Sequence, residues 1–153
     1  MAEAFIFAGV AGYVGRPDAT GAVGVFRRAS KGGEWSHVFG DHPAHTVYVH
    51  PDDPSIVYAG TTNGVWRSTD SGASFQKADF PDADKQIWSF LAIEGHPDRI
   101  YAGGAPIDVY RSDDRGATWA KLPNPGMPMR CKGPFEPRVM RMAQRPGRPD
   151  EIY

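Results

Sequence analysis

Short runs of β-branched and aromatic residues recur along the chain, and clusters of Gly, Pro, Asp, Asn and Ser separate them. Such runs are typical of β-strands, because branched and aromatic side chains suit a half-buried pleated surface. No segment keeps the period of an amphipathic helix. The pattern therefore predicts an all-β chain, with strands at residues 5–7, 24–26, 45–49, 56–58, 65–67, 87–93, 100–101 and 109–110.

The predicted strands repeat. Ile-Val-Tyr-Ala-Gly at 56–60 reappears as Ile-Tyr-Ala-Gly at 100–103. Val-Trp-Arg-Ser at 65–68 reappears as Val-Tyr-Arg-Ser at 109–112, and an earlier copy is Val-Phe-Arg-Arg at 25–28. A repeat of about 40 to 50 residues with four strands per unit is typical of a β-propeller. Its four-stranded antiparallel units, called blades, bury their faces only by stacking on their neighbours.

The repeat divides this single domain into three units, at about 5–38, 46–77 and 87–122, and the start of the next at about 139–153. Within that start, residues 139–143 are predicted to form an inner strand. Propellers typically have about four to eight units, so three and a fraction predict an incomplete ring. Either the chain is a fragment of a longer propeller, or it is complete and self-associates to close the ring.

A turn motif follows the third strand of two units. It reads Ser-Thr-Asp-Ser-Gly-Ala-Ser-Phe at 68–75 and Ser-Asp-Asp-Arg-Gly-Ala-Thr-Trp at 112–119. A degenerate copy at 28–35 has Ser30 in place of the Asp. With these motifs in register with the strand repeat, nearly the whole chain resembles the Asp-box (BNR) repeat β-propellers. That superfamily includes sialidases, sortilin-type receptors, xyloglucan-cleaving hydrolases and photosystem II assembly-factor-like proteins.

The chemistry of this motif predicts a structural role. An Asp side chain accepts backbone N–H groups in its own turn, Gly supplies a positive φ, and the aromatic ring is buried between sheets. The resemblance implies that the motif lies away from the substrate site. The residues expected to be structural are Ser68, Asp70, Gly72, Phe75, Ser112, Asp114, Gly116 and Trp119.

The resemblance also implies a ligand face, formed by the loops that join second to third strands and fourth strands to the next first strands. Two insertions, at about 11–22 and 123–137, interrupt the repeat on this face. Long loops on a rigid scaffold often carry binding, although both insertions are equally compatible with tolerated surface loops. The ligand-face candidates are Tyr13, Arg16, Asp41, His42, His45, Asp84, Asp108, Arg130, Lys132 and Arg138.

Composition narrows the classes of partner. The 17 Lys+Arg against 18 Asp+Glu argue against nucleic-acid binding through bulk charge. One cysteine, Cys131, excludes a disulfide framework and a cysteine zinc cage. Asp41, His42 and His45 lack the further ligands that a metal needs, and we predict no metal or cofactor. No apolar run approaches the roughly 20 residues of a membrane span, and no signal peptide is seen, so we expect a cytoplasmic protein without membrane contact.

No catalytic set can be assigned. Residues 123–153 carry six Lys+Arg against three Asp+Glu, and an arginine near a central channel could hold a carboxylate, but the motif that opens sialidase domains is missing. The primary hypothesis is therefore a binding scaffold that presents loops around a channel to a protein or a carbohydrate. The alternative is a sialidase-like or xyloglucanase-like glycoside hydrolase whose catalytic residues lie partly outside this chain. Asp79, Asp82, Asp84 and Asp108 are the candidates for its acid–base pair.

Overall fold

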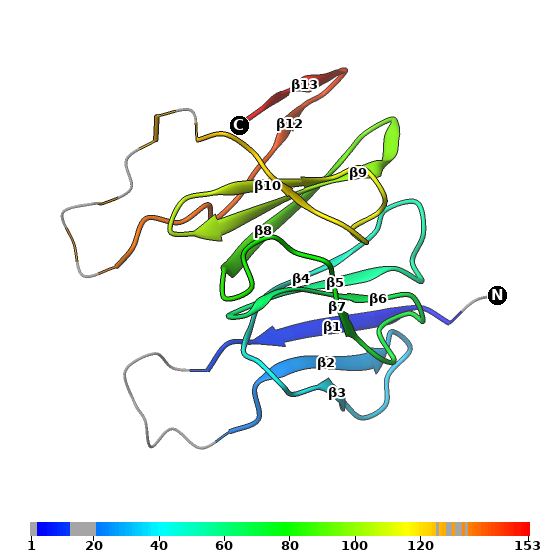
Figure 1. Cartoon of the computed structure of the whole chain (residues 1–153). Coiled ribbons are helices and arrows are strands. Elements are labelled where there is room, and N and C mark those ends of the chain that lie inside the picture. The colour runs from blue at the N-terminus through cyan, green and yellow to red at the C-terminus, as the bar shows by residue number, and fades with distance from the viewer. Residues whose placement is uncertain (1–2, 13–20, 125, 128–129, 131–132, 134) are drawn as a thin grey trace.

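A computed structural model describes residues 3–12, 21–124, 126–127, 130, 133 and 135–153 (Figure 1). The first sheet has β1 (Phe5–Val10), β2 (Gly24–Ala29) and β3 (Ser36–Phe39). The second has β4 (Ala44–Val49), β5 (Val57–Thr61), β6 (Gly64–Ser68) and β7 (Gln76–Lys77). The third has β8 (Gln86–Ile93), β9 (His96–Ala105), β10 (Val109–Ser112) and β11 (Ala120–Lys121). The last strands are β12 (Gln144–Arg145) and β13 (Arg148–Ile152).

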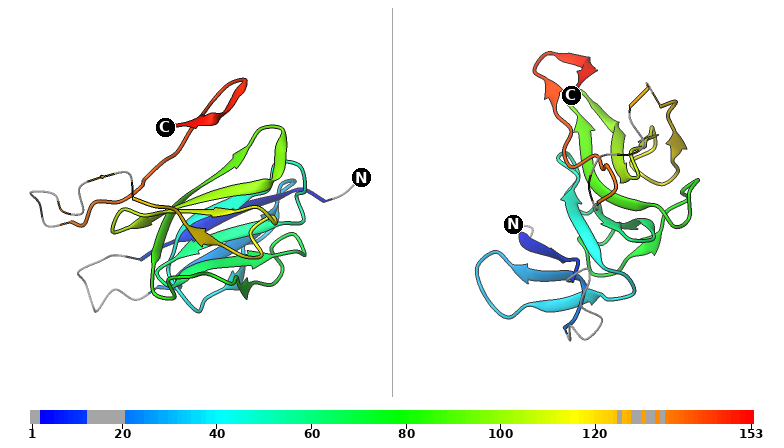
Figure 2. Two further views of the ribbon diagram at one scale, coloured as in Figure 1. Left: turned by 45° about the horizontal axis from the view of Figure 1, so that its top comes forward. Right: turned by 90° about the vertical axis from the view of Figure 1, so that its left-hand side faces the viewer.

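Strand neighbours within each sheet pair antiparallel and in chain order. The prediction of an all-β chain with four-stranded antiparallel sheets is confirmed. Seen from one end, the sheets follow one another, with the β12–β13 hairpin last (Figure 2, right). Among the described residues, no helix is long and apolar enough to cross a membrane.

The prediction of an inner strand at 139–143 is wrong. Residues 137–143 are described and lie outside any strand. A strand needs a neighbour, and β13 pairs only with β12 and, through Tyr153, with Ala143. The segment is instead held by single bonds to the third sheet: Val139 N–H donates to the Gly104 carbonyl, and the Val139 carbonyl accepts from Ser89 Oγ.

The connections gather at two ends of the sheets. The links β3–β4, β5–β6, β7–β8 and β9–β10 lie at the left of Figure 1, together with the described residues 135–138. We call this side the loop end. The β4–β5 and β8–β9 turns lie at the right. This arrangement follows from the antiparallel pairing, because successive strands reverse direction.

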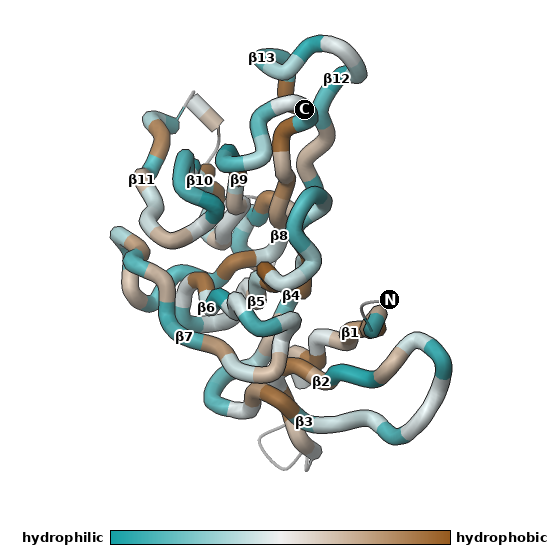
Figure 3. The backbone as a smooth tube through the Cα atoms, turned by 90° about the vertical axis from the view of Figure 1, so that its right-hand side faces the viewer, coloured by the Kyte–Doolittle hydropathy of each residue, from teal (hydrophilic) through white to brown (hydrophobic). Residues whose placement is uncertain are grey.

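Apolar residues are buried between consecutive sheets rather than within one sheet. The larger cluster joins the second sheet to the third and includes Tyr58, Val65, Ile87, Phe90 and Trp119. The smaller one joins the first to the second. Figure 3 shows hydrophobic stretches along the inner strands and hydrophilic ones at the turns. Each sheet therefore depends on its neighbour for a core, as a stacked repeat requires.

The turns at 68–75 and 112–119, which we call the Ser-Asp-Gly turns, have the same internal bonds. In the first, Ser68 Oγ donates to Asp70 Oδ1 (2.7 Å) and accepts from Gly72 N–H (2.8 Å). Asp70 also accepts from Ser74 N–H (2.9 Å) and Ser74 Oγ (2.6 Å). The second repeats these four distances through Ser112, Asp114, Gly116 and Thr118. The Asp of each turn therefore holds the backbone of its own loop.

Each Ser-Asp-Gly turn also sits on the preceding sheet. A Cβ on Gly116 would lie 2.4 Å from Tyr58 Cε1, and one on Gly72 would lie 2.4 Å from Phe7 Cε1. Both glycines have a positive φ, +77° and +73°. Each position therefore requires glycine for two reasons: the positive φ disfavours other residues, and an aromatic ring leaves no room for a Cβ.

Replacing Gly116 with Ala should destabilise the protein more than replacing Gly95 with Ala. Gly95 also has a positive φ, but open space surrounds it, so Gly95→Ala should cost only the backbone strain of about 1–2 kcal/mol. Gly116→Ala adds a clash with Tyr58, which we expect to raise the loss by about another 1–3 kcal/mol. Urea unfolding measures both, and equal losses would contradict the packing role of Gly116.

The Asp of the first turn should make stability depend on pH. Hydrogen bonds, first from the Ser74 hydroxyl, lower the pKa of Asp70 to about 2, despite an opposing effect of burial. Because the folded pKa lies below the unfolded value of about 3.9, this contribution is present above pH 4 and is lost as the pH falls toward 2. Asp70→Asn should flatten the dependence of the free energy of unfolding on pH in that window. A slope unchanged by Asp70→Asn would exclude this role.

Candidate functional site

The loop end holds the described ligand-face candidates. Asp41 and Arg130 are exposed there. Tyr13, Arg16 and Lys132 lie outside the described residues, as does Cys131. The remaining candidates fall into two groups. Asp84 and Asp108 are carboxylates on the β7–β8 and β9–β10 connections, whereas His42, His45 and Arg138 have flat side chains near the start of β4 or in the segment before β12.

Asp108 lies in the β9–β10 connection and is only 7% exposed. Its carboxylate pairs with Lys85 and with Lys121 Nζ at 3.0 Å. Lys121 also pairs with Asp82 (3.1 Å), which accepts from the Tyr110 hydroxyl at 2.6 Å. Burial alone would raise the pKa of Asp108, but the bonds from Lys85 and Lys121 outweigh it and lower that pKa. The group is therefore held as a carboxylate, which suits an ion-pair network better than a proton donor.

Asp84 has a separate partner. Asp84 is exposed, and its carboxylate accepts from Asn63 Nδ2 at 2.9 Å. The side-chain oxygen of Asn63, Oδ1, accepts in turn from Lys77 Nζ. This chain of bonds ties the β7–β8 loop to the β5–β6 turn. Asp84 and Asp108 thus each have their own cationic or amide partners, and neither contacts the other.

β4 and β8, the first strands of the second and third sheets, each contain a β-bulge. The pairing of β4 with β5 skips His45, and the pairing of β8 with β9 skips Trp88. A bulge re-aims the extra residue. The two rings stack with centroids 4.0 Å apart and planes 11° apart. The Arg138 guanidinium lies 4.3 Å from the Trp88 centroid and 5.7 Å from that of Phe135. We call His45, Trp88, Arg138 and Phe135 the inner stack.

The sequence prediction included His45 and Arg138 but missed Trp88 as a site residue. A signal was present: the 43-residue offset that relates Tyr58 to Tyr101 also relates His45 to Trp88. Lys85 and Lys121, the partners of Asp108, were missed as well, and nothing in their local sequence indicates a distant carboxylate.

The histidines at 42 and 45 have different surroundings. His42 lies beside Phe39 and Trp66, with ring centroids 6.5 and 5.6 Å away. His45 stacks on Trp88, and both of its ring nitrogens are buried and make no hydrogen bond to the part of the chain that the structure describes. Burial, and then the Arg138 charge, lower the pKa of His45. Within the described ranges, no three His, Cys, Asp or Glu side chains converge as a metal site would require.

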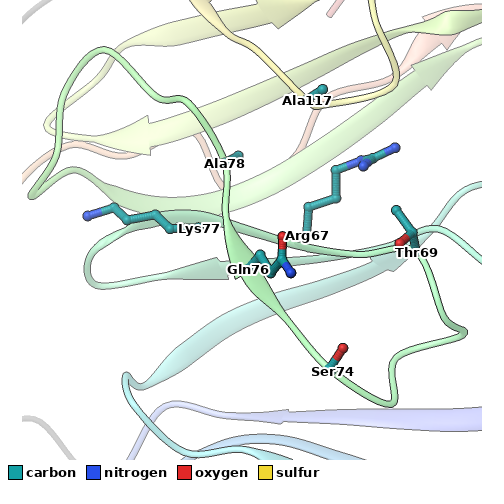
Figure 4. Close-up of a pocket in the computed structure, with 7 residues that line it drawn as sticks. All are labelled: Arg67, Thr69, Ser74, Gln76, Lys77, Ala78 and Ala117. Carbon is teal, nitrogen blue, oxygen red and sulfur yellow. The ribbon is translucent and has the colours of Figure 1, made fainter.

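Two hollows lie away from these candidates. One, of about 220 Å³, lies between the outer edge of the second sheet and the third-sheet turn (Figure 4). Its lining residues are Arg67, Thr69, Ser74, Gln76, Lys77, Ala78 and Ala117. The other, of about 340 Å³, lies by the β8–β9 turn. Neither is lined by a predicted ligand-face residue, so the inner stack remains the candidate site.

No family model matches the chain. It is 32% identical over 100 residues to the xyloglucanase Xgh74A of Acetivibrio thermocellus, covering 49% of this chain and 12% of that protein. It is 28% identical over 152 residues to a xyloglucanase of Hypocrea jecorina, covering 74% and 18%. The chain thus spans less than a fifth of the length of these curated relatives.

Solved structures with the same fold include an ancestral GH74 enzyme, with a TM-score of 0.55 and 21% identity over 65% of this chain and 15% of that one. Another is YCF48 from Cyanidioschyzon merolae, with a TM-score of 0.51 and 15% identity over 65% and 34%. These likenesses support a β-propeller fold.

Protonation of His45 should oppose folding. Because its folded pKa lies below the unfolded value of about 6.5, the unfolded chain takes up a proton first, and stability falls as the pH drops below 6.5. His45→Phe keeps a ring against Trp88 and should lose this part of the pH dependence of stability. Thermal unfolding from pH 7.5 to 5 measures it, and parallel curves for wild type and His45→Phe would contradict the assignment.

Proposed function

We propose that this chain forms a segment of an Asp-box (BNR) β-propeller, about three units and the start of another, and that its loop end binds a polysaccharide without cleaving it. The observation that carries the non-catalytic proposal is the engagement of Asp108 by Lys85 and Lys121. A glycosidase needs one protonated carboxyl group and one free carboxylate across the scissile bond. A carboxylate buried between two ammonium groups serves neither purpose.

The Asp-box assignment is supported by the two Ser-Asp-Gly turns. They share one bonding pattern, with Asp70 and Asp114 as acceptors and glycines in the left-handed region. They follow equivalent strands, β6 and β10. Two turns with one geometry in phase with the strand repeat are what an Asp-box propeller requires.

The polysaccharide ligand is supported by the xyloglucanase relatives and by the inner stack. A half-buried Trp edge beside a guanidinium offers an apolar surface and N–H donors at one place, and carbohydrate rings present both apolar faces and hydroxyl groups. Among the described residues the Arg138 guanidinium has no carboxylate partner, and its Nε donates to the Glu136 carbonyl (3.4 Å). Its Nη groups would be the donors to such hydroxyls.

The second candidate function is xyloglucan hydrolysis. It is favoured by the similarity to the Hypocrea jecorina xyloglucanase, which extends over 74% of this chain. In that case the acid and base would be Asp41, Asp79, Asp84 or groups beyond the described residues, because Asp82 and Asp108 both pair with Lys121.

Native affinity gels cast with xyloglucan, together with a reducing-sugar assay on the same preparation, test the proposal. We expect retarded migration without release of reducing ends. Trp88→Ala should weaken retardation about tenfold or more, the loss of one stacked ring. Trp35→Ala is the matched control, since Trp35 is 44% exposed and outside the loop end.

Either of two results would overturn the binding-only proposal. Release of reducing ends that stops in Asp84→Asn or Asp41→Asn would establish the hydrolase instead. Migration unchanged by xyloglucan, with folding verified by circular dichroism, would exclude this polysaccharide as the ligand.

A further inference from the structure

The three sheets carry the same cross-strand pair on equivalent strands. Phe7 pairs with Arg27, Tyr58 with Arg67, and Tyr101 with Arg111. In each case the aromatic residue is two positions before a glycine on the same strand face: Gly9, Gly60 and Gly103. We call each aromatic–arginine pair a socket, because two of them receive a Ser-Asp-Gly turn.

The first two sockets are filled in the same way. In the first, Arg27 Nη1 donates to the Ser71 carbonyl at 2.9 Å, and Gly72 lies against the Phe7 ring. In the second, Arg67 Nε and the Tyr58 hydroxyl both donate to the Arg115 carbonyl, each at 2.8 Å. Ser71 and Arg115 are the positive-φ non-glycine residues of the described chain, with φ of 58° and 56°. In each turn the left-handed residue therefore presents its carbonyl to the arginine of the socket. The glycine that follows has no side chain, so its backbone can lie against the aromatic ring.

The third socket has the same groups without a turn among the described residues. Tyr58 is fully buried, whereas Tyr101 is only half-buried and its hydroxyl makes no hydrogen bond within the described ranges. The Arg111 side chain is 41% exposed and pairs with Asp113 (2.9 Å).

Next to the third socket, the same face of the third sheet already contacts the segment that follows it. A Cβ on Gly103 would lie 2.5 Å from Val139 Cγ1, just as one on Gly60 would lie 2.8 Å from Ile87 Cγ2 of the next sheet. Val139 thus takes, on the third sheet, the place that Ile87 takes on the second. The third sheet therefore continues the established interface on the face that carries Tyr101 and Arg111.

We propose that Tyr101 and Arg111 form a docking site for a Ser-Asp-Gly turn of a further repeat of this kind. The carbonyl of its left-handed residue would accept from Arg111 and the Tyr101 hydroxyl, and its glycine would cover the Tyr101 ring. The inference rests on the repeat architecture proposed above and is independent of what the loop end binds.

The described turns of a second copy do not supply this occupant. The turns at 68–75 and 112–119 already occupy the sockets of the preceding sheets in their own chain. The degenerate turn at 28–35 is unseated, with Gly32 in open space and Trp35 exposed. It lacks the Asp, and Lys31, at the position of Ser71, is not left-handed. Its carbonyl is therefore not presented as in the seated turns.

The test uses the whole chain, labelled with ¹⁵N, and a cyclised synthetic peptide with the sequence of residues 109–121. We expect a saturable shift of the Arg111 Nε–H and Tyr101 amide signals in NMR spectra. Arg111→Ala should weaken peptide binding about fivefold or more, the loss of one hydrogen bond to a charged donor. Asp113→Thr installs the residue that the second unit has at this position, Thr69. It should bind at least as tightly as the wild type, because Arg111 is then released.

The control peptide carries Gly116→Leu and should not bind, because its side chain would meet the Tyr101 ring. Equal binding of both peptides, or no shift at millimolar peptide in a chain whose spectrum is that of a folded protein, would overturn the proposal. A concentration-dependent dimer in light scattering that Arg111→Ala dissolves would also overturn it, in favour of a second copy. These measurements involve no xyloglucan, so their failure is distinct from failure of the ligand proposal.

Discussion

The contact between each Ser-Asp-Gly turn and the preceding sheet is the constraint on which the rest of the structure depends. A single twisted sheet of short strands cannot bury both faces, and the clusters around Tyr58 and Phe39 exist only between sheets. The turn closes the outer part of that interface by placing glycine on a ring and a carbonyl on an arginine. If the turn opened, Trp119 would lose its place against Phe80 and Phe90.

At the loop end, opposite the Ser-Asp-Gly turns, this stacking places fewer constraints on the side chains. The loop end contributes Phe80 to the core between sheets, while its polar side chains form networks of their own. Lys85, Lys121, Asp82 and Asp108 form one that ties the β7–β8 loop to the third sheet. Such a network stiffens the loop but neutralises the carboxylates that a hydrolase would use. The same charges therefore support the proposal of binding without acid–base chemistry at Asp108.

The bulges at His45 and Trp88 connect the regular strand pairing of the sheets with the candidate site at the loop end. The regular ladder builds the stacked sheets, and one extra residue in each inner strand turns a ring out of the ladder. Because both bulges occupy the same place in consecutive units, the rings meet face to face and Arg138 joins them. The repeat that stacks the sheets thus also aligns a row of flat groups at the candidate site.

The sequence by itself determined the strand class, the repeat and the internal bonds of the turns. These depend on residues two to four positions apart, such as Ser68, Asp70 and Ser74, whose chemistry acts before any tertiary contact forms. It also brought His45, Arg138 and Asp108 into consideration through loop placement.

Only the tertiary structure decided what those residues do. The partners of Asp108 lie 23 residues before it and 13 after it, and Trp88 meets His45 across 43 residues. The strand predicted at 139–143 is absent because pairing depends on a neighbour, which composition cannot reveal. Local hydrogen bonds are encoded in local sequence, whereas ion pairs, ring stacks and strand partners are set by how the sheets are stacked in space.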